Sequence, residues 1–199
     1  MPKPEIAHLL RDALSRKGSG SSDFDLNPDV KLPEDRVLRP AAVLVGVLAD
    51  TGQVVLTKRS ARLKHHPGQI AFPGGKQDPT DPTLTAAALR EAQEEIGLDP
   101  TQVEILGELP VHETVTSFRV TPIVGIIHGG PRFVPEAGEV DEVFSVPLSH
   151  LGNPANYHIE GRRWQGRRRY YFSVPYGPYY IWGATARILR GLADRLDQT

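Results

Sequence analysis

The sequence predicts an α/β fold in which helices pack on the faces of a mixed β-sheet. Strand-like apolar runs occur before, between and after two helical segments. The run Pro40–Leu48 is almost continuously apolar, as is typical of a strand buried on both faces. The segments Thr83–Ile96 and Gly183–Leu196 instead repeat their apolar residues at helical spacing. Strands and helices that alternate in this way favour a layered architecture.

The N-terminal region predicts a helix at Pro4–Arg16, because its apolar residues recur three and four positions apart. The Gly- and Ser-rich segment Lys17–Asp23 that follows is expected to be a flexible linker. We therefore expect residues 1–35 to form an N-terminal helix and linker, and residues 36–199 to form the functional domain.

Within residues 36–199, a hairpin joins Pro40–Leu48 to Gln53–Thr57 across the turn sequence Asp50-Thr51-Gly52. The other strand-like runs contain β-branched and aromatic residues and are bounded by turn residues. They are Val103–Leu109, Arg119–Ile127, Glu142–Pro147 and Arg168–Val174.

Composition excludes several classes of function. The 23 basic and 24 acidic residues give a net charge of −1, so the chain as a whole does not attract polyanions. The chain contains no cysteine, which excludes disulfides, thiolate metal sites and cysteine nucleophiles. The first residues mix acids and bases without the apolar core of a secretory signal, and no apolar run is long enough to span a membrane. We expect a cytoplasmic protein without a membrane partner.

The segment with the clearest chemical signal is the predicted helix Thr83–Ile96. Glu91, Glu94 and Glu95 fall within about 100° of arc on this helix, with Thr85, Leu89, Ala92 and Ile96 expected toward the core on the opposite side. Three neighbouring carboxylates repel one another unless a cation lies between them. A divalent cation with oxygen ligands, such as Mg²⁺, removes this conflict. Arg90 can hold Glu94 through an i,i+4 contact.

Glutamates on a helix also occur as an ordinary solvated face. The flanking glycines argue against that alternative here. Gly74 and Gly75 precede the helix and permit close approach of the backbone to a ligand, and Gly97 is positioned to end the helix as a C-cap.

This arrangement resembles the Nudix box, in which Gly, five residues, Glu, seven residues and Arg-Glu lead to a Glu-Glu pair and a final Gly. The run Arg90–Leu98 (REAQEEIGL) matches the second half of that box. The first half departs from it: Asp81 stands where Glu is expected, and eight residues instead of seven separate it from Arg90. Because that Glu is mainly structural in the family, the departure concerns the geometry of the loop more than the chemistry.

A second match lies upstream. The residues Leu56–Ser60, Lys64, Gly68 and Phe72–Gly75 are similar to the signature of the coenzyme A diphosphatase branch of Nudix hydrolases, with Lys64 where that signature has Arg. Similar segments occur at Arg39–Leu44, Glu139–Phe144 and Ile181–Ala186, so the resemblance spans about residues 39–190.

The resemblance implies a Nudix-like α/β/α sandwich with a mixed sheet and the loop-helix-loop of the family. It implies Mg²⁺- or Mn²⁺-dependent hydrolysis of the pyrophosphate bond of coenzyme A, or a derivative of it, to 3′,5′-ADP and 4′-phosphopantetheine. Metal ligands are then Glu91, Glu94, Glu95 and the carbonyl of Gly75. Substrate contacts are then Lys58, Arg59, Lys64, Phe72 and Gly74.

The proton acceptor is left open by the sequence. Nudix enzymes often use a Glu outside the box, and Glu139 and Glu142 are the main candidates, with Glu113 a weaker one. Glu94 and Arg90 complete the set expected to act in catalysis. Glu139 and Glu142 can equally be ordinary exposed residues of a loop.

Two groups of cations have an open role. The segment with Lys58, Arg59, Arg62, Lys64, His65 and His66 could recognise phosphates or be a solvated loop. Five arginines, at positions 162, 163, 167, 168 and 169, surround Trp164, Tyr170 and Tyr171. They could bind nucleic acid or stack an adenine, but solvated arginines on a β-hairpin explain them as well and are favoured. We therefore expect a small-molecule substrate and no nucleic-acid partner.

Two other functions stay open. One is a Nudix pyrophosphatase for ADP-ribose, NADH or a dinucleoside polyphosphate. The other is a noncatalytic module of the same fold that binds a nucleotide or RNA, although such relatives are expected to lose box glutamates that are present here.

Overall fold

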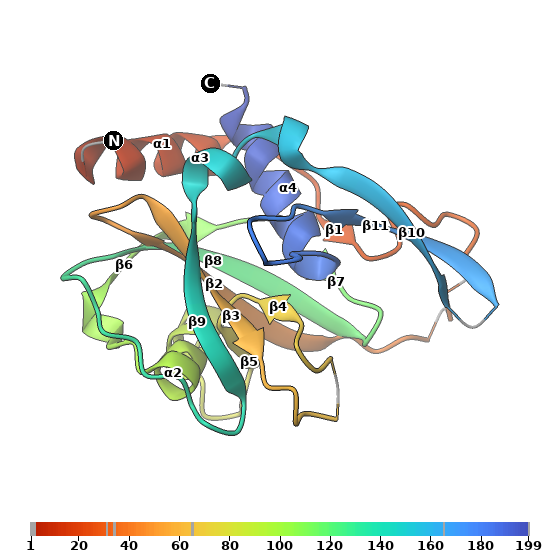
Figure 1. The fold of residues 1–199 in the computed structure, drawn as a ribbon, viewed down its shortest axis with the longest axis horizontal. Helices are drawn as coiled ribbons and strands as arrows, with labels where there is room; N and C mark the ends of the chain where they lie inside the picture. Colours follow the sequence, from red (N-terminus) through yellow and green to blue (C-terminus); the bar gives the residue numbers. More distant parts are fainter. Residues whose placement is uncertain (1–2, 31, 34, 65, 165, 199) are drawn as a thin grey trace.

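A mixed sheet of nine strands lies at the centre of the molecule, between helices on both faces (Figure 1). The structure, a computed structural model, describes residues 3–30, 32–33, 35–64, 66–164 and 166–198. The expected α/β/α sandwich is confirmed. Among the helices of the described residues, none combines the length and apolar character of a membrane span.

Two long strands form the middle of the sheet. β2 (Arg39–Leu48) and β8 (Phe118–Ile127) run parallel and pair along their whole length, from Arg39 opposite Phe118 to Leu48 opposite Ile127. The neighbouring strands join them in antiparallel pairs, with β9 on the far side of β3. They are β3 (Gln53–Arg59), β4 (Ile70–Ala71), β5 (Gly74–Lys76), β6 (Val103–Glu108), β7 (His112–Glu113) and β9 (Val140–Pro147).

The helices divide between the faces. α1 (Lys3–Ser15), the short α3 (Leu148–Leu151) and α4 (Ala184–Leu196) lie on one face, and α2 (Leu84–Ile96) lies on the other (Figure 1). Single-turn 3₁₀ helices occupy Pro100–Gln102 and Pro154–Asn156. The hairpin of β10 (His158–Trp164) and β11 (Arg167–Ser173) forms a sheet of its own.

Alternation along β2 explains why its sequence is apolar throughout. Ala41, Val45 and Val47 pack in the core beneath α1 and α4, whereas Ala42 and Leu44 pack in the core beneath α2. Successive side chains of a strand point to opposite faces, and here both faces are covered. The predicted strands and helices are thus confirmed, with ends that differ by one or two residues. The short strands β1, β4, β5 and β7, which lack a periodic signal, and the longer strand β10 are not among the predicted strands.

The N-terminal segment packs closely on the rest of the chain. Ile6, Leu10 and Ala13 of α1 are at most 2% exposed and belong to the core beneath α4. Within the segment predicted as a linker, β1 (Ser21–Ser22) pairs with β7, parallel to it. A Gly- and Ser-rich sequence gives no periodicity from which a two-residue strand could be predicted.

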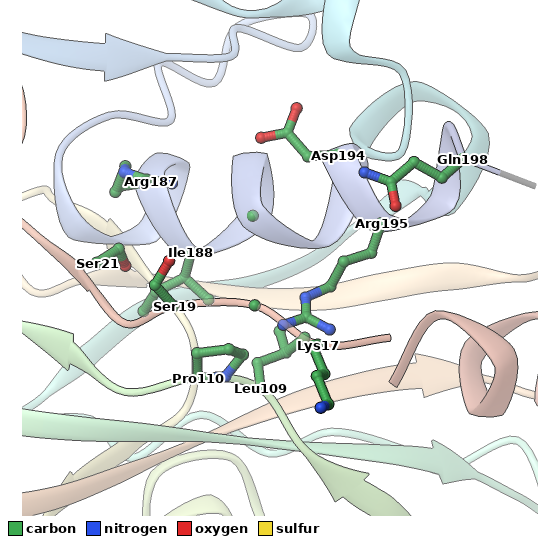
Figure 2. Close-up of a pocket in the computed structure, with 12 residues that line it drawn as sticks. Lys17, Ser19, Ser21, Leu109, Pro110, Arg187, Ile188, Asp194, Arg195 and Gln198 are labelled. Atoms are coloured by element: carbon green, nitrogen blue, oxygen red, sulfur yellow. The ribbon is translucent and has the colours of Figure 1, made fainter. Parts of the chain in front are cut away.

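Hydrogen bonds between the two helix ends reinforce this packing. The Arg195 guanidinium donates to the carbonyl oxygens of Ala13 and Arg16, and the Arg16 guanidinium donates to the Arg195 carbonyl. Cationic groups at helix C-termini satisfy carbonyls that lack an intrahelical partner. Figure 2 shows Arg195 reaching from α4 toward Lys17 in a pocket of about 200 Å³ that contains none of the predicted site residues.

Candidate active site

The start and end of α2 are fixed by its sequence. Thr83 caps the N-terminus, and its hydroxyl oxygen accepts a hydrogen bond of 3.0 Å from the Ala86 amide. Gly97 ends the helix in the left-handed conformation, at φ 67°, and its amide donates to the Gln93 carbonyl at 2.9 Å. The predicted glycine C-cap is confirmed.

The acidic side of α2 faces the sheet more closely than the helical arc predicts. Ala92 and Ile96 are fully buried as expected, but Thr85 and Leu89 are only half-buried. The buried face instead includes Ala87, Ala88 and Glu95. The expectation that the glutamates lie opposite the core is therefore wrong for Glu95, whereas Glu94 is exposed as expected. Glu95 can turn inward because α2 rests on β5, whose glycines leave room for carboxylates.

The glycine pair makes this contact possible. A Cβ atom on Gly75 would lie 2.5 Å from Glu91 Oε1, so a side chain there would displace that carboxylate. Gly74, at φ 150°, packs against the backbone of Ala42 and Val43, and its amide donates to Glu95 Oε2 at 3.1 Å. The pair thus shapes the surface on which Glu91 and Glu95 lie.

Arg90 joins α2 to the loop that precedes it. Its Nε and Nη2 atoms donate to the two carboxylate oxygens of Asp81 at 3.0 and 2.9 Å, and Nη1 donates to Glu94 at 2.9 Å, the predicted i,i+4 contact. Nη2 also donates to Glu91 and to the Lys76 carbonyl. The Asp81 side chain is 6% exposed, and these bonds lower its pKa and raise that of Arg90. Arg90 therefore has the contacts of a positioning residue.

Asp81 resolves the irregular first half of the Nudix box. The turn from Asp78 to Asp81, closed by the bond from the Asp81 amide to the Asp78 carbonyl, carries the carboxylate back toward Arg90. Asp81 Oδ2 also accepts from the Asp78 amide at 2.8 Å. The extra residue before Arg90 is accommodated in this loop, ahead of the Thr83 cap. Spacing alone does not predict the pairing, because it depends on the conformation of the turn.

The carboxylates near the glycine pair influence one another. Burial raises the pKa of Glu95 to about 7. The hydrogen bond from the Gly74 amide favours the ionised carboxylate and so opposes this rise, whereas the charges of Glu91 and Glu139 add to it. Burial also raises the pKa of Glu91, opposed by Arg90, with contributions from Glu94 and Glu139. Glu91, Glu95 and Glu139, which we call the glutamate cluster, thus share one electrostatic environment. The Glu139 carbonyl accepts from the Ser60 amide at 2.8 Å, which ties this exposed residue to the end of β3.

The donor chemistry of the glutamate cluster fits a hard divalent cation. Its groups are carboxylate oxygens whose negative charges oppose one another, and a bound cation relieves that repulsion. Across the described residues, no three His, Cys, Asp or Glu side chains already converge as a metal site. Two of the predicted ligands have other partners, since Glu94 is 59% exposed and paired with Arg90 and Glu95 accepts from Gly74.

The carbonyl of Gly75 faces the sheet. On either side of it along β2 and β5, the Leu44 amide donates to the Pro73 carbonyl and the Gln77 amide donates to the Pro40 carbonyl. In an antiparallel pair every second pair of opposite residues is hydrogen-bonded, so Gly75 and Ala42, which lie between these two pairs, are hydrogen-bonded to each other. A metal would have to use the second lone pair of that oxygen.

The other candidate acids lie in different places. Glu142, on β9, is opposite Lys58 of β3 and accepts a hydrogen bond from the Tyr179 hydroxyl. The Tyr179 ring stacks on Phe144 with centroids 3.6 Å apart, which fixes the hydroxyl. Tyr179 lies beyond the motifs, and nothing in the sequence marked it. Glu113, on β7, pairs with Arg36 and serves the docking of the N-terminal segment.

The predicted substrate contacts divide into two groups. Lys58 and Lys64 are exposed, and Arg59 is close enough to Glu95 to lower its pKa. His65 lies outside the described residues. Phe72 is 4% exposed and packs in the core beneath α4, so its side chain does not face a substrate, and Gly74 packs on β2. We therefore leave Phe72 out of the proposed contacts.

Comparison with known proteins agrees with this geometry. Residues 37–165 match the model of the NUDIX domain. The chain is 41% identical over 196 residues to the uncharacterized Nudix hydrolase NudL of Pectobacterium atrosepticum, covering 98% of each chain. It is 47% identical to the protein of the same name from Citrobacter koseri, over 78% of this chain and 81% of that one.

A solved structure has the same fold. The MutT protein of Methanosarcina mazei Go1 superposes with a TM-score of 0.53 at 20% identity, covering 83% of this chain and 97% of that one. The match to the domain and the identity to full-length relatives both extend over more than half of the chain. The chain therefore belongs to the Nudix family and is a hydrolase of pyrophosphate bonds.

Proposed function

We propose that this enzyme hydrolyses the pyrophosphate bond of coenzyme A, or of a derivative of it, to 3′,5′-ADP and 4′-phosphopantetheine with Mg²⁺ or Mn²⁺. The observation that carries the proposal is the glutamate cluster beside the cationic end of β3. In this proposal, carboxylates for a divalent cation and side chains for phosphate come together at the end of β3, near the glycine pair.

Glu91 and Glu95 are the proposed principal metal ligands, and Glu139 and Glu94 are further candidates. A bound divalent cation supplies Lewis acidity toward a phosphate oxygen and neutralises charge that develops during hydrolysis. Arg90 holds Glu91 and Glu94 in place and ties α2 to the Asp81 turn. Such support of metal ligands by neighbouring residues is a general requirement of metal sites.

Hydrolysis requires one water molecule, whose oxygen bonds to phosphorus as the bridging P–O bond breaks. The proton released needs an acceptor, and Glu139 and Glu142 are the candidates. Glu139 lies in the electrostatic environment of Glu91 and Glu95, and Glu142 is oriented by Tyr179. The positions of the two residues support both roles and do not choose between them.

Two features support coenzyme A as the substrate. The signature from Leu56 to Gly75 forms the end of β3, the following loop and β5, and so adjoins the glutamate cluster. Lys58 and Lys64 extend from this region into solvent, where charge-assisted hydrogen bonds could hold the 3′-phosphate that distinguishes coenzyme A from ADP-ribose and NADH.

The test is a comparison of kcat/KM for coenzyme A, ADP-ribose, NADH and diadenosine tetraphosphate with Mg²⁺ and with Mn²⁺, with products identified by chromatography. We expect coenzyme A to be the best substrate and to yield the two named products. Replacing Lys58 and Lys64 with Gln should raise the KM for coenzyme A and leave that for 3′-dephospho-coenzyme A unchanged. Faster hydrolysis of any other compound would refute the assignment of substrate but not that of the reaction.

A further inference from the structure

The tip of the β10–β11 hairpin concentrates positive charge. Between Gly161 and Arg169 the sequence has five arginines, which we call the arginine tip, and no acidic residue. Because the whole chain has a formal charge of −1, the rest of it carries −6. The near-neutral total therefore conceals a local excess of positive charge on this hairpin, which lies at the periphery of the molecule (Figure 1).

The strand register sets like charges opposite each other. Arg162 is the cross-strand partner of Arg169, and Arg163 is the partner of Arg168. Side chains directly opposite in an antiparallel pair are close neighbours, and like charges there destabilise the pair. A hairpin selected only for its own stability would place a carboxylate at one position of each pair.

No carboxylate of the described residues compensates this charge. The ion pairs within the described part of the chain involve other arginines. Glu160 is the acid of the hairpin, but Ser173 donates to its Oε1 at 2.6 Å and Tyr180 donates to its Oε2 at 2.8 Å. Both of its oxygens are thus held at the base of the hairpin, away from the arginine tip.

One face of the hairpin presents an exposed aromatic ring beside a guanidinium. The Arg168 guanidinium lies 5.5 Å from the centroid of the Tyr170 ring, and Tyr170 is 42% exposed. Gly161 lies opposite Tyr170, and a Cβ there would come within 2.6 Å of Arg168 and 3.1 Å of the Tyr170 ring. The glycine therefore allows the guanidinium and the phenol to lie over the strand.

The base of the hairpin is held rigidly on the body. The Asn27 side-chain nitrogen donates to the Tyr170 carbonyl at 2.8 Å, and the Tyr170 amide donates to the Asn27 side-chain oxygen at 2.8 Å. Phe172 lies beneath the guanidinium groups of Arg187 and Arg190 of α4. The exposed cations are thus presented by an anchored element.

In place of the sequence-based expectation of solvated arginines and no nucleic-acid partner, we propose that the hairpin binds single-stranded nucleic acid, with phosphates on the arginine tip and a base stacked on Tyr170. A series of cations with an exposed aromatic ring is the combination that binds single strands without regard to sequence. This binding is separate from the hydrolytic site and does not depend on which pyrophosphate the enzyme cleaves.

The test is fluorescence anisotropy of a labelled 12-nucleotide RNA of mixed sequence, titrated with the full chain from 50 to 200 mM NaCl. With about four phosphates neutralised, the slope of log Kd against log salt should be about 3, so binding weakens about 50-fold over this range. In R163Q/R168Q the slope should fall by about 1.4. Tyr170→Leu should weaken binding at least fivefold with an unchanged slope.

The matched control is R119Q/R132Q, which removes two exposed arginines outside the hairpin and should leave binding to the RNA unchanged. Hydrolysis of coenzyme A by R163Q/R168Q should equal that of the unmodified enzyme. Three results would overturn the proposal: equal loss of RNA binding in the control, a raised KM for coenzyme A in the hairpin variant, or hairpin-dependent binding only to vesicles of phosphatidylglycerol and phosphatidylcholine.

Discussion

Arg90 and Asp81 form a bidentate ion pair that fastens the helix of the active site to the loop before it. The two bonds, of 3.0 and 2.9 Å, join both oxygens of one carboxylate to one guanidinium, and the Asp81 side chain is only 6% exposed. This geometry is the strongest form of the Arg–carboxylate contact. It preserves the connection between loop and helix although the spacing of the Nudix box is changed.

Asp81→Asn should lower kcat/KM about 10- to 100-fold, because Arg90 would lose the partner that orients it toward Glu91 and Glu94. The control is Asp78→Asn, whose carboxylate lies 3.9 Å from Arg90 and should matter less than threefold. Steady-state kinetics with saturating Mg²⁺ measure both. Equal effects of the two substitutions would show that the bidentate pair has no special role.

Glu95 should make the metal-free protein less stable as the pH rises. Its pKa is about 7 in the folded chain against an ordinary value of 4.5, so the folded state binds more protons than the unfolded state between these values. The free energy of unfolding therefore falls from about pH 4.5 to 7, by up to about 3 kcal/mol. Urea denaturation in EDTA at pH 5 and pH 8 measures the change.

Glu95→Gln removes this dependence. Between pH 5 and pH 8 the unmodified protein should lose up to about 3 kcal/mol of its free energy of unfolding, and the variant should not show this loss. The variant should also lose most of its activity. Glu94→Gln, which alters an exposed carboxylate, is the matched control and should retain the pH dependence. A Glu95→Gln profile parallel to that of the unmodified protein would contradict the burial of the charge.

Tyr179→Phe should lower kcat several-fold without raising KM, because the ring stacked on Phe144 is kept while the bond to Glu142 is lost. If Glu142 accepts the proton, the pH dependence of kcat in Tyr179→Phe should also be shifted relative to that of the unmodified enzyme. Tyr180→Phe serves as the control, since that hydroxyl contacts Glu160 instead. Unchanged kinetics in Tyr179→Phe would leave Glu139 as the acceptor.

Leu10→Ala should destabilise the whole chain by about 2–5 kcal/mol, since Leu10 is fully buried between α1 and the common core. Unfolding should remain a single transition when followed by circular dichroism and by tryptophan fluorescence. Ala7→Gly, at a half-buried position of the same helix, is the control and should cost about 1 kcal/mol. A separate early transition in Leu10→Ala would mean that residues 1–35 fold independently.

The sequence was sufficient for most of the long elements, with the strand β10 as an exception. Periodicity predicted α2, and the glycine that ends it, because both depend on local interactions. The inward turn of Glu95 was not predictable, since it depends on space left by Gly74 and Gly75 in the strand β5, on which the helix packs. The bonds of Asp81 to Arg90 and of Tyr179 to Glu142 likewise depend on loop paths. Phe72 was predicted as a substrate contact because it belongs to the Phe72–Gly75 part of the signature, but its side chain is buried in the core.

Mn²⁺ binding measured by the electron paramagnetic resonance of the free ion, together with hydrolysis of coenzyme A on the same samples, tests the central claim most directly. If Glu91 and Glu95 hold the cation, the unmodified enzyme should bind Mn²⁺ and turn over, and E91Q/E95Q should do neither at the same concentrations while remaining folded. A folded double variant that binds Mn²⁺ and hydrolyses coenzyme A like the unmodified enzyme would contradict the account.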